Sequence, residues 1–402
     1  MAVVLSLIRS VAPSKLVMDS EWHLVTDCCT SARERFASPS YSTVRAWFNA
    51  LHGMGAMVGW YYGRSADGLA SGPKSPNKLR ASQFLESIGT QPIAMDGLHR
   101  GIQQLQSSAD VVARLASARR SVHVLFSQRS YHAGGMHGRA IYTAVEALTF
   151  LGTPWGFLPA DGDGEESGGL AAKLRSLPAD DVLILAGVSH VEPPAAAAVE
   201  EWVATRGTAR LLIIDEGSEP MAFDATSGYH HPSADRQRRV SALSGVRHVG
   251  LLAAEEMLTL FEDTLLPTEP ASRAVSCYET EGSRAGRPTT LGVMCMAGAR
   301  PGERLDRGPY RHVAVVNLRA STARVSMSLA LPGGGAPRPG ERLRDLVEIG
   351  HVYTADANGR VDLLLAPAQV LLLEISTCAT CLTHSAWCPG CEDHEVRGGG
   401  ER

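Results

Sequence analysis

Two stretches near the amino terminus set the expectation for the fold: KLVMDSEWHLVTD at residues 15–27 and YSTVRAWFNALHGMGAMVGWYYGR at residues 41–64. Residues 15–20 carry a short continuous apolar run, which is typical of a buried parallel strand. Residues 41–51 place apolar side chains on one helical stripe, and Gly53 and Gly55 close that helix. Residues 56–62 read as a second strand, rich in aromatic side chains. The pattern predicts a parallel strand–helix–strand unit.

Glu21 and Trp60 fall at the ends of these two strands. In α/β folds, chemistry collects at the carboxyl ends of parallel strands. A carboxylate beside aromatic rings suits sugar cleavage, because the carboxylate attacks the anomeric carbon while a flat ring holds the sugar. The plainer alternative, a solvated glutamate beside a core tryptophan, stays open.

The two quoted stretches resemble the seventh and eighth strands of a retaining glycosidase barrel, nearest to glycoside hydrolase family 42, the β-galactosidases, and its relatives. The resemblance implies retaining hydrolysis of terminal β-galactosides, with Glu21 as nucleophile and no cofactor required. It also implies that Trp60 walls the sugar subsite, with His23 and Arg64 as further polar contacts to the carbohydrate substrate.

The sequence departs from the family at the second carboxyl group. The acid/base glutamate of the family follows an asparagine, and this chain has no Asn-Glu dipeptide. A retaining mechanism needs two carboxyl groups about 5 Å apart. Two strands also cannot close a barrel, and their open edge exposes backbone and apolar surface. We therefore expect the chain alone to have little or no activity, and its status as an enzyme stays open.

Residues from Arg119 onward alternate strands with helices, which predicts a flavodoxin-like doubly wound sheet. The expected strands are 122–126, 155–158, 182–185 and 210–214. The loop after the first of them has neither a G-x-G-x-x-G nor a Walker pattern. His132, His137 and His190 follow strands, but no serine or cysteine nucleophile lies in a sharp elbow beside them. FSQRSYHAGGMHGR at residues 126–139 resembles the non-catalytic trimerisation domain of family 42 enzymes, which implies a homotrimer.

From about residue 272 the pattern changes to short alternating runs between Gly/Pro turns, which predicts an antiparallel β-sandwich. HVAVVNLR at residues 312–319 and LAPAQVLLLEI at residues 365–375 resemble the C-terminal β-domain of many glycosidases. The predicted domains are thus 1–118, the C-terminal part of a TIM barrel; 119–265, the trimerisation domain; 272–376, the β-sandwich; and 377–402, a cysteine-rich tail.

The tail holds two C-x-x-C pairs, formed by Cys378, Cys381, Cys388 and Cys391. Four thiolates suit tetrahedral Zn²⁺. The short spacer between the pairs and the Gly/Arg-rich end instead favour a frayed cysteine-rich extension.

Composition narrows the class of protein. The formal net charge is −4 with histidine neutral, which argues against a nucleic-acid partner. No apolar run approaches the roughly 18 residues of a membrane span. Half of the eight cysteines crowd the tail, unlike a disulfide scaffold, so we expect a reducing, cytoplasmic compartment.

Two other functions stay open. The chain could be a non-catalytic carbohydrate-binding or assembly protein derived from the family, which would bind galactosides without turnover. It could also be a regulatory flavodoxin-like domain with a zinc-binding tail, which would contain stoichiometric Zn²⁺.

Overall fold

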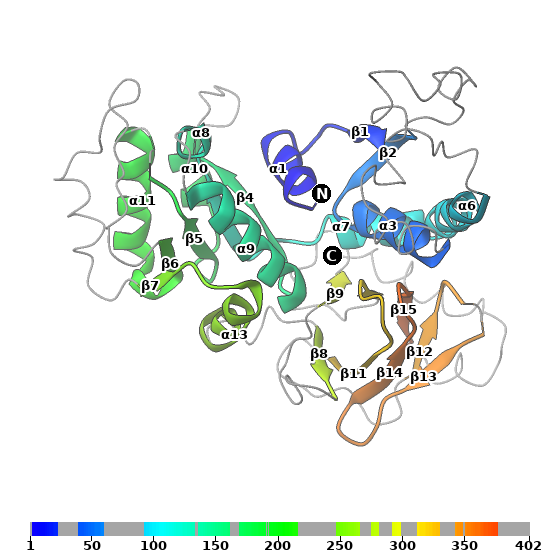
Figure 1. Ribbon diagram of the computed structural model, residues 1–402. Coiled ribbons are helices and arrows are strands. Elements are labelled where there is room, and N and C mark those ends of the chain that lie inside the picture. The colour runs from blue at the N-terminus through cyan, green and yellow to red at the C-terminus, as the bar shows by residue number, and fades with distance from the viewer. Residues whose placement is uncertain are drawn as a thin grey trace, which may run out of the picture. The chain divides into compact units, whose positions relative to one another are not determined.

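Strands in the described part of the chain form a five-stranded parallel sheet, a parallel strand pair and two antiparallel sheets, as the computed structural model in Figure 1 shows. The described residues are 2–22, 39–59, 92–132, 136–160, 169–189, 191, 193–215, 247–265, 275–280, 292–298, 312–329, 342–348 and 350–376. The expected mixed α/β chain, with a parallel sheet and separate antiparallel sheets, is confirmed.

Residue contacts group these elements into two compact units. The first unit holds α1 (Ala2–Val11), β1 (Val17–Trp22), β2 (Met54–Gly59) and all elements from β3 to α13. The second holds α6 (Pro92–Ser107), α7 (Ala109–Ala116) and strands β8 to β15, and α3 (Pro39–Leu51) is divided between the two. The predicted domain boundaries stay predictions. The contacts show which elements belong to one compact unit, but they do not show where one domain ends and the next begins.

Along the chain, β1, α3 and β2 follow the predicted strand–helix–strand order, and the two strands pair in parallel. Gly53 follows α3 with a φ of 92°, a left-handed conformation that glycine adopts without steric cost. Its amide donates to the carbonyl of Ala50, so the helix ends at the predicted glycine.

The parallel sheet has the strand order β4-β3-β5-β6-β7. Its strands are β3 (Val122–Phe126), β4 (Trp155–Pro159), β5 (Val182–Ala186), β6 (Leu211–Asp215) and β7 (Arg247–Gly250). Counted along the chain this is the order 2-1-3-4-5, which flavodoxin-like doubly wound sheets share. β5 is buried at all five positions, as expected of a parallel strand covered on both faces.

Helices pack around this sheet in two pairs. α9 (Met136–Leu151) contacts α13 (Ala254–Leu265), and α10 (Gly169–Ser176) contacts α11 (Pro193–Arg206). Two short helices, α8 (Gln128–His132) and η3 (Thr208–Arg210), complete the unit. Leucine and valine side chains from β5, β6, α10 and α11 share one buried core.

Two short elements of the first unit, β7 and α8, were not predicted from the sequence. A helical stretch was expected within residues 246–260 and is present as α13 from Ala254, but Arg247–Gly250 before it pairs with β6 as the edge strand. Four residues are too few to show an alternating pattern, and pairing with β6 decides their conformation. α8 lies in a stretch expected to be loop, and at five residues it is too short for a helical stripe.

The second unit contains two antiparallel sheets, ordered β13-β12-β15-β10-β9 and β14-β11-β8. The strands are β8 (Val275–Glu279), β9 (Val293–Gly298), β10 (His312–Asn317), β11 (Ala323–Leu329), β12 (Arg342–Asp345), β13 (Val352–Thr354), β14 (Arg360–Leu365) and β15 (Val370–Ser376). Side chains such as Val315, Met327 and Leu363 meet in one core that both sheets share. The two sheets therefore face each other as a sandwich.

The five-stranded sheet is also buried on its second face. Ala314, Val316 and Leu372 alternate with the sandwich core residues and are buried too, and α7 packs on β9 and β10. α3 crosses α6 closely, because an added Cβ on Gly97 would collide with the backbone of Pro39. The Trp47 indole, fully buried, donates to Gln104 across the same two helices at 3.0 Å.

Cys295 of β9 is disulfide-bonded. Disulfides persist mainly in oxidising compartments. A disulfide at Cys295 does not fit the reducing compartment that the distribution of cysteines suggested. The cytoplasmic location stays a prediction.

Candidate functional site

The carboxyl ends of β1 and β2 lie together, and this is where the sequence predicted chemistry. Glu21 is the penultimate residue of β1, and Trp22 pairs in register with Gly59, the last residue of β2. The backbone therefore places Glu21 at the edge from which the chain leaves toward Trp60. His23, Trp60 and Arg64 lie outside the described residues, so their contacts with a substrate beside Glu21 stay predictions.

Asp19 is a second carboxyl group on β1 that the sequence reasoning passed over. It is partly buried and lies two residues before Glu21, so regular strand alternation would put both on one face. The pairing with β2 is irregular between Asp19 and Trp22, which breaks that alternation. We therefore assign no catalytic role to Asp19. Its position two residues before Glu21, in MDSEW, is the sequence signal by which this second carboxyl group could have been noticed.

Close packing against glycines supports the strand pair. The side chain of Arg9, on α1, lies where a Cβ on Gly53 would be, and Leu16 lies in the same way over Gly55 of β2. A larger residue at either glycine would require the Arg9 or Leu16 side chain to move aside.

His52 follows α3 and packs against Trp155 of β4, with ring centroids 6.1 Å apart. Burial above all, together with the nearby positive charges that include Arg120 and Arg9, lowers the pKa of His52 to about 3. Arg120 donates to the Ser10 hydroxyl at 2.9 Å, and the Phe157 amide donates to the same oxygen at 3.2 Å. The neutral imidazole and these bonds join α1 and the β2 turn to the edge strand β4, which is a structural role.

The carboxyl end of β3 and β5 is the switch point where doubly wound folds bind ligands. His137 is buried there: Nδ1 lies 2.6 Å from the Ala186 carbonyl, and Nε2 accepts from the Ser127 amide at 3.2 Å. Burial lowers its pKa, outweighing the bond to Ala186, so the imidazole is neutral. Both ring nitrogens are engaged with backbone groups, so the buried imidazole joins α9 to the ends of β3 and β5.

Of the other two histidines that follow strands in the sequence, only His132 is described, and it forms no site at this edge. His132 ends α8 and is exposed, with its ring edge-on to Tyr131. His190 lies outside the described residues. The Ser130 hydroxyl accepts from the Ser189 amide at 3.0 Å, which again bridges the two loops.

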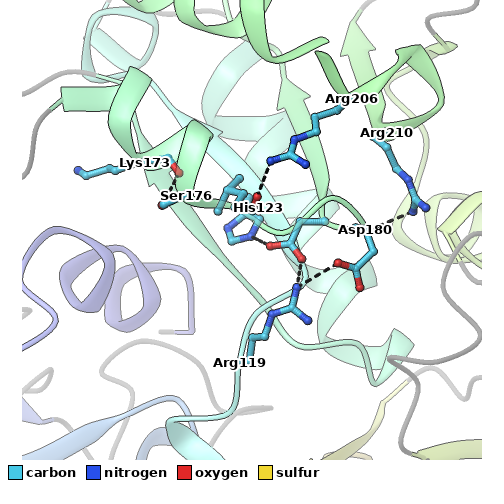
Figure 2. Close-up of polar contacts among 9 residues, drawn as sticks. Arg119, His123, Lys173, Ser176, Asp180, Arg206 and Arg210 are labelled. Carbon is cyan, nitrogen blue, oxygen red and sulfur yellow. Dashed lines mark hydrogen bonds and ion pairs between the residues drawn. The ribbon is translucent and has the colours of Figure 1, made fainter. Parts of the chain in front are cut away.

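A network of charged side chains occupies the opposite, amino-terminal end of β3 and β5 (Figure 2). Asp181, which is fully buried before β5, accepts hydrogen bonds from Arg119 and contacts Nε2 of His123 at 2.8 Å. Arg119 also contacts Asp180 at 3.5 Å.

Two more arginines bind backbone oxygens in the same network. Arg206 donates to the Leu177 carbonyl at 3.0 Å, and Arg210 donates to the Asp180 carbonyl at 3.1 Å, as the dashed lines in Figure 2 show. Cations near the carboxyl end of α10 also suit the helix dipole. Each of these contacts joins strands, helices and loops that pack together in the first unit, so the network is structural.

The sandwich carries its own charged cluster. Glu374 of β15 contacts Arg344 at 2.8 Å and His312 at 3.6 Å on the neighbouring strands. Burial acts to raise the pKa of Glu374, but these two contacts together lower it. Asp345 is buried beside this cluster, and burial raises its pKa despite the amide bond from Val347.

The structure neither supports nor tests the predicted zinc ligands, because Cys378, Cys381, Cys388 and Cys391 lie outside the described residues. Within the described segments, no three His, Cys, Asp or Glu side chains gather as a metal site would require. None of the described helices combines the length and apolar character needed to cross a membrane.

Comparison with known proteins finds likeness at the level of structure. No family model matches the sequence, and no curated protein matches it. The fold matches the apo exo-carrageenase GH42 from Bacteroides ovatus with a TM-score of 0.60 at 18% identity, over 92% of this chain. A rhamnosidase from Novosphingobium sp. PP1Y also matches, at 10% identity, over 87% of this chain and 30% of its own. Its TM-score of 0.41 is too low to show a shared fold.

The chain spans 43% of the length of the exo-carrageenase. At this identity the likeness concerns the fold alone. The chain therefore shares its fold with part of a longer glycoside hydrolase structure.

Proposed function

We propose that this chain is the C-terminal part of a retaining, β-galactosidase-like glycoside hydrolase of the family 42 type. The observation that carries the proposal is Glu21 at the carboxyl end of β1, beside the parallel strand β2. The exo-carrageenase, with which 92% of this chain shares its fold, supports it.

In the proposed reaction the Glu21 carboxylate forms a bond to the anomeric carbon of a terminal β-galactoside as the glycosidic bond breaks. The departing oxygen takes a proton from a second carboxyl group, which then activates the water that releases Glu21. Trp60 would hold one face of the sugar ring, with His23 and Arg64 as polar contacts. The second carboxyl group would come from polypeptide outside these 402 residues.

The domain roles follow from the same proposal. β1 and β2 would be the last two strands of a (β/α)8 barrel, and the sandwich would be the C-terminal β-domain. The parallel sheet would be the trimerisation domain, so the assembled protein would be a homotrimer. His137 at the switch point has both ring nitrogens bound to backbone groups, which supports a non-catalytic role for this sheet.

The test uses the form of the protein purified from its source cells and, in parallel, residues 1–402 alone. We expect the purified native form to hydrolyse aryl β-galactosides and the 402-residue chain to show no turnover. Glu21→Ala should lower kcat by roughly 10⁴-fold or more, as loss of a nucleophile does. Azide should restore turnover and give the α-galactosyl azide, because it enters from the face that the carboxylate occupied.

Glu348→Ala is the matched control, since Glu348 is an exposed glutamate of the sandwich. It should leave kcat unchanged and show no response to azide. Turnover by the 402-residue chain that Glu21→Gln abolishes would contradict the need for a second polypeptide segment. Turnover of the native form that survives Glu21→Ala would contradict the role of Glu21.

A second function, a non-catalytic carbohydrate-binding or assembly protein, is favoured by where the described core lies. In the described part of the chain, the parallel sheet and the sandwich each hold an extensive apolar core, and neither core includes a residue of β1 or β2. Galactoside binding without turnover, unchanged by Glu21→Gln, would establish this function instead.

The proposed hydrolysis uses no cofactor. Zinc bound by the tail cysteines is a separate proposal, tested by elemental analysis of the purified chain. One Zn²⁺ per chain would establish the site, and substoichiometric zinc would favour the frayed extension.

A further inference from the structure

The side chains of Arg9 and Arg120 each pass over a glycine. Arg9, in the last turn of α1, occupies the space where a Cβ on Gly53 would be. Arg120, shortly before β3, does the same over Gly156 of β4. The absence of a side chain at each glycine leaves room for a guanidinium group. We call these two side chains the arginine pair.

Contacts around the arginine pair place its two members close together. His52 and Trp155, the residues before the two glycines, contact each other with ring centroids 6.1 Å apart. Ser10, the neighbour of Arg9 on α1, accepts a hydrogen bond from Arg120 at 2.9 Å. α1 itself packs on β4. The two guanidinium groups therefore lie over neighbouring backbone segments of one compact unit.

The arginine pair brings two like charges together where water is partly excluded. Burial, and then the charge of Arg9, lowers the pKa of Arg120 to about 10, and burial also lowers the pKa of Arg9. Both groups stay cationic at neutral pH. Among the described residues no carboxylate pairs with Arg120, whereas the adjacent Arg119 has Asp181. Cations removed from water are normally paired with an anion, and Arg120 lacks one from this part of the chain.

Arg120 keeps most of its hydrogen-bonding capacity. A guanidinium presents its N–H donors in a planar fork. Within the described segments the protein accepts a hydrogen bond from Nη1 alone, at the Ser10 hydroxyl. Nε and Nη2 are not among the side-chain atoms that are buried without a partner, so solvent reaches them. These two atoms form an edge that a ligand can approach.

Ser10 holds the guanidinium of Arg120 in place. Its hydroxyl donates to the Ser6 carbonyl at 2.7 Å and accepts from Arg120 at 2.9 Å and from the Phe157 amide at 3.2 Å. The single donor and both lone pairs of the hydroxyl are then used. Arg120 is therefore positioned before a ligand arrives, which lowers the entropic cost of binding.

The dipole of α1 does not by itself account for the arginine pair. A cation in the last turn of a helix interacts favourably with the carbonyl groups there, and this suffices for Arg9. Arg120 comes from a different element and donates to a hydroxyl group. Its charge lies near that of Arg9, and an anion bound beside both would offset their repulsion.

The donors also indicate which anion fits. One guanidinium fork already satisfies the two oxygens of a carboxylate. A tetrahedral oxyanion has further oxygens, so it can accept from two guanidinium groups at once.

We propose that the arginine pair binds a tetrahedral oxyanion of the phosphate or sulfate class, either free or as an ester group. The Nε–Nη2 edge of Arg120 binds two of its oxygens, and Arg9 supplies the second positive charge. The bound anion joins α1 to β4. This inference goes beyond the proposed hydrolysis and does not depend on it, because neither arginine belongs to the predicted sugar site.

Phenylglyoxal, which modifies accessible guanidinium groups, tests the proposal on the full, unmodified chain. Peptide mapping follows each arginine with and without inorganic phosphate, at an ionic strength held constant with sodium chloride. We expect phosphate to slow modification of Arg120 by about tenfold, because the bound anion occupies its donors. Arg175, an exposed arginine of α10, should react at the same rate throughout.

Thermal unfolding provides a second measurement, since a ligand that binds only the folded chain raises the melting temperature. Arg120→Gln should abolish the rise that phosphate produces, and Arg9→Gln should reduce it. Arg175→Gln, the matched control, should keep it in full. If Arg120→Gln does not fold, protection of Arg120 in the unmodified chain still decides the question.

Inorganic sulfate and galactose 6-phosphate distinguish the sources of the anion. Protection of Arg120 by both inorganic ions at similar concentrations would support a site for the free ion. Protection by galactose 6-phosphate at a lower concentration than inorganic phosphate would support a site for an ester group.

Two results would overturn the proposal. Modification of Arg120 at an unchanged rate with all three anions would show that the arginine pair binds none of them. Equal slowing at Arg120 and Arg175 would show a general effect of salt rather than a site. Loss or absence of galactoside turnover has no bearing on either result, so the proposed function is judged separately.

Discussion

Asp181 is a buried carboxylate whose partners are an arginine and a histidine, a set of residues that can equally serve catalysis. Its position decides between the two roles. It lies at the amino-terminal end of the parallel sheet, whereas ligands of doubly wound folds bind beyond the carboxyl ends of the strands. Position in the fold, rather than residue type, therefore assigns Asp181 to stability.

Asp181→Asn should lower the free energy of unfolding by about 3–5 kcal/mol, because it leaves the Arg119 charge without its buried counter-ion. Urea denaturation followed by tryptophan fluorescence measures the loss. Asp180→Asn is the control, since Asp180 is half exposed and lies 3.5 Å from the same arginine. It should cost no more than about 1 kcal/mol. Equal small losses in the two variants would contradict a stabilising role for the buried pair.

Asp345 makes the stability of the sandwich depend on pH. Burial raises its folded pKa above the ordinary value of 3.8, so the folded state binds a proton more tightly than the unfolded state. The contribution of this group to stability is therefore greatest at acid pH and declines as pH rises through the folded pKa. Asp345→Asn keeps the oxygen that accepts from Val347 and removes the charge.

We expect Asp345→Asn to have a higher melting temperature than the unmodified chain at neutral pH, with the difference shrinking as pH falls toward the unfolded pKa. Differential scanning calorimetry at a series of pH values measures it. A variant that is less stable at neutral pH would show that the ionised carboxylate stabilises the turn.

At the scale of elements, Gly53 connects a local conformation to packing. Its positive φ ends α3, and the Arg9 side chain occupies the space above it. Gly169 provides a comparison, because its φ is 69° and nothing lies within 4 Å of an added Cβ.

Gly169→Ala should cost about 1–2 kcal/mol for the left-handed backbone alone. Gly53→Ala should cost more, since Arg9 must also move. Urea denaturation measures both losses of unfolding free energy. The difference between them reports the cost of moving Arg9 of α1 away from this turn. Equal losses would mean that Arg9 moves aside freely.

Elements with a long apolar pattern could be predicted from the sequence, and short or edge elements could not. β3 was predicted at its observed bounds, because its five residues, VHVLF, are mostly apolar and stand out as a short run between polar segments. β13, with three residues, was missed because pairing with β12 creates it. The break between β14 and β15 was missed as well, and there Ala368 adopts a φ of 52°.

The candidate site could be predicted only as a position. The apolar run before Glu21 and the register of β1 with β2 agree on where the strand ends. The side chains that surround a site come from segments far apart in sequence, and His23, Trp60 and Arg64 lie outside the described residues. No local pattern could therefore predict which side chains lie near Glu21.

At the scale of the whole molecule, the first unit holds two separate parallel sheets of unequal size. The five-stranded parallel sheet and the sandwich of the second unit each bury an extensive core, whereas β1 and β2 form only a strand pair. Under the proposed hydrolysis Glu21 needs an acid partner, so residues 1–402 alone should be inactive.

Under the proposed function, Glu21 forms the covalent glycosyl intermediate of a retaining enzyme. A 2-deoxy-2-fluoro-galactosyl fluoride can trap this intermediate, because fluorine at C2 slows its release and the adduct can be located by mass spectrometry. We expect one galactosyl adduct per chain in the native form, on the peptide that contains Glu21. An adduct on another carboxyl group, or turnover with no adduct at all, would contradict it.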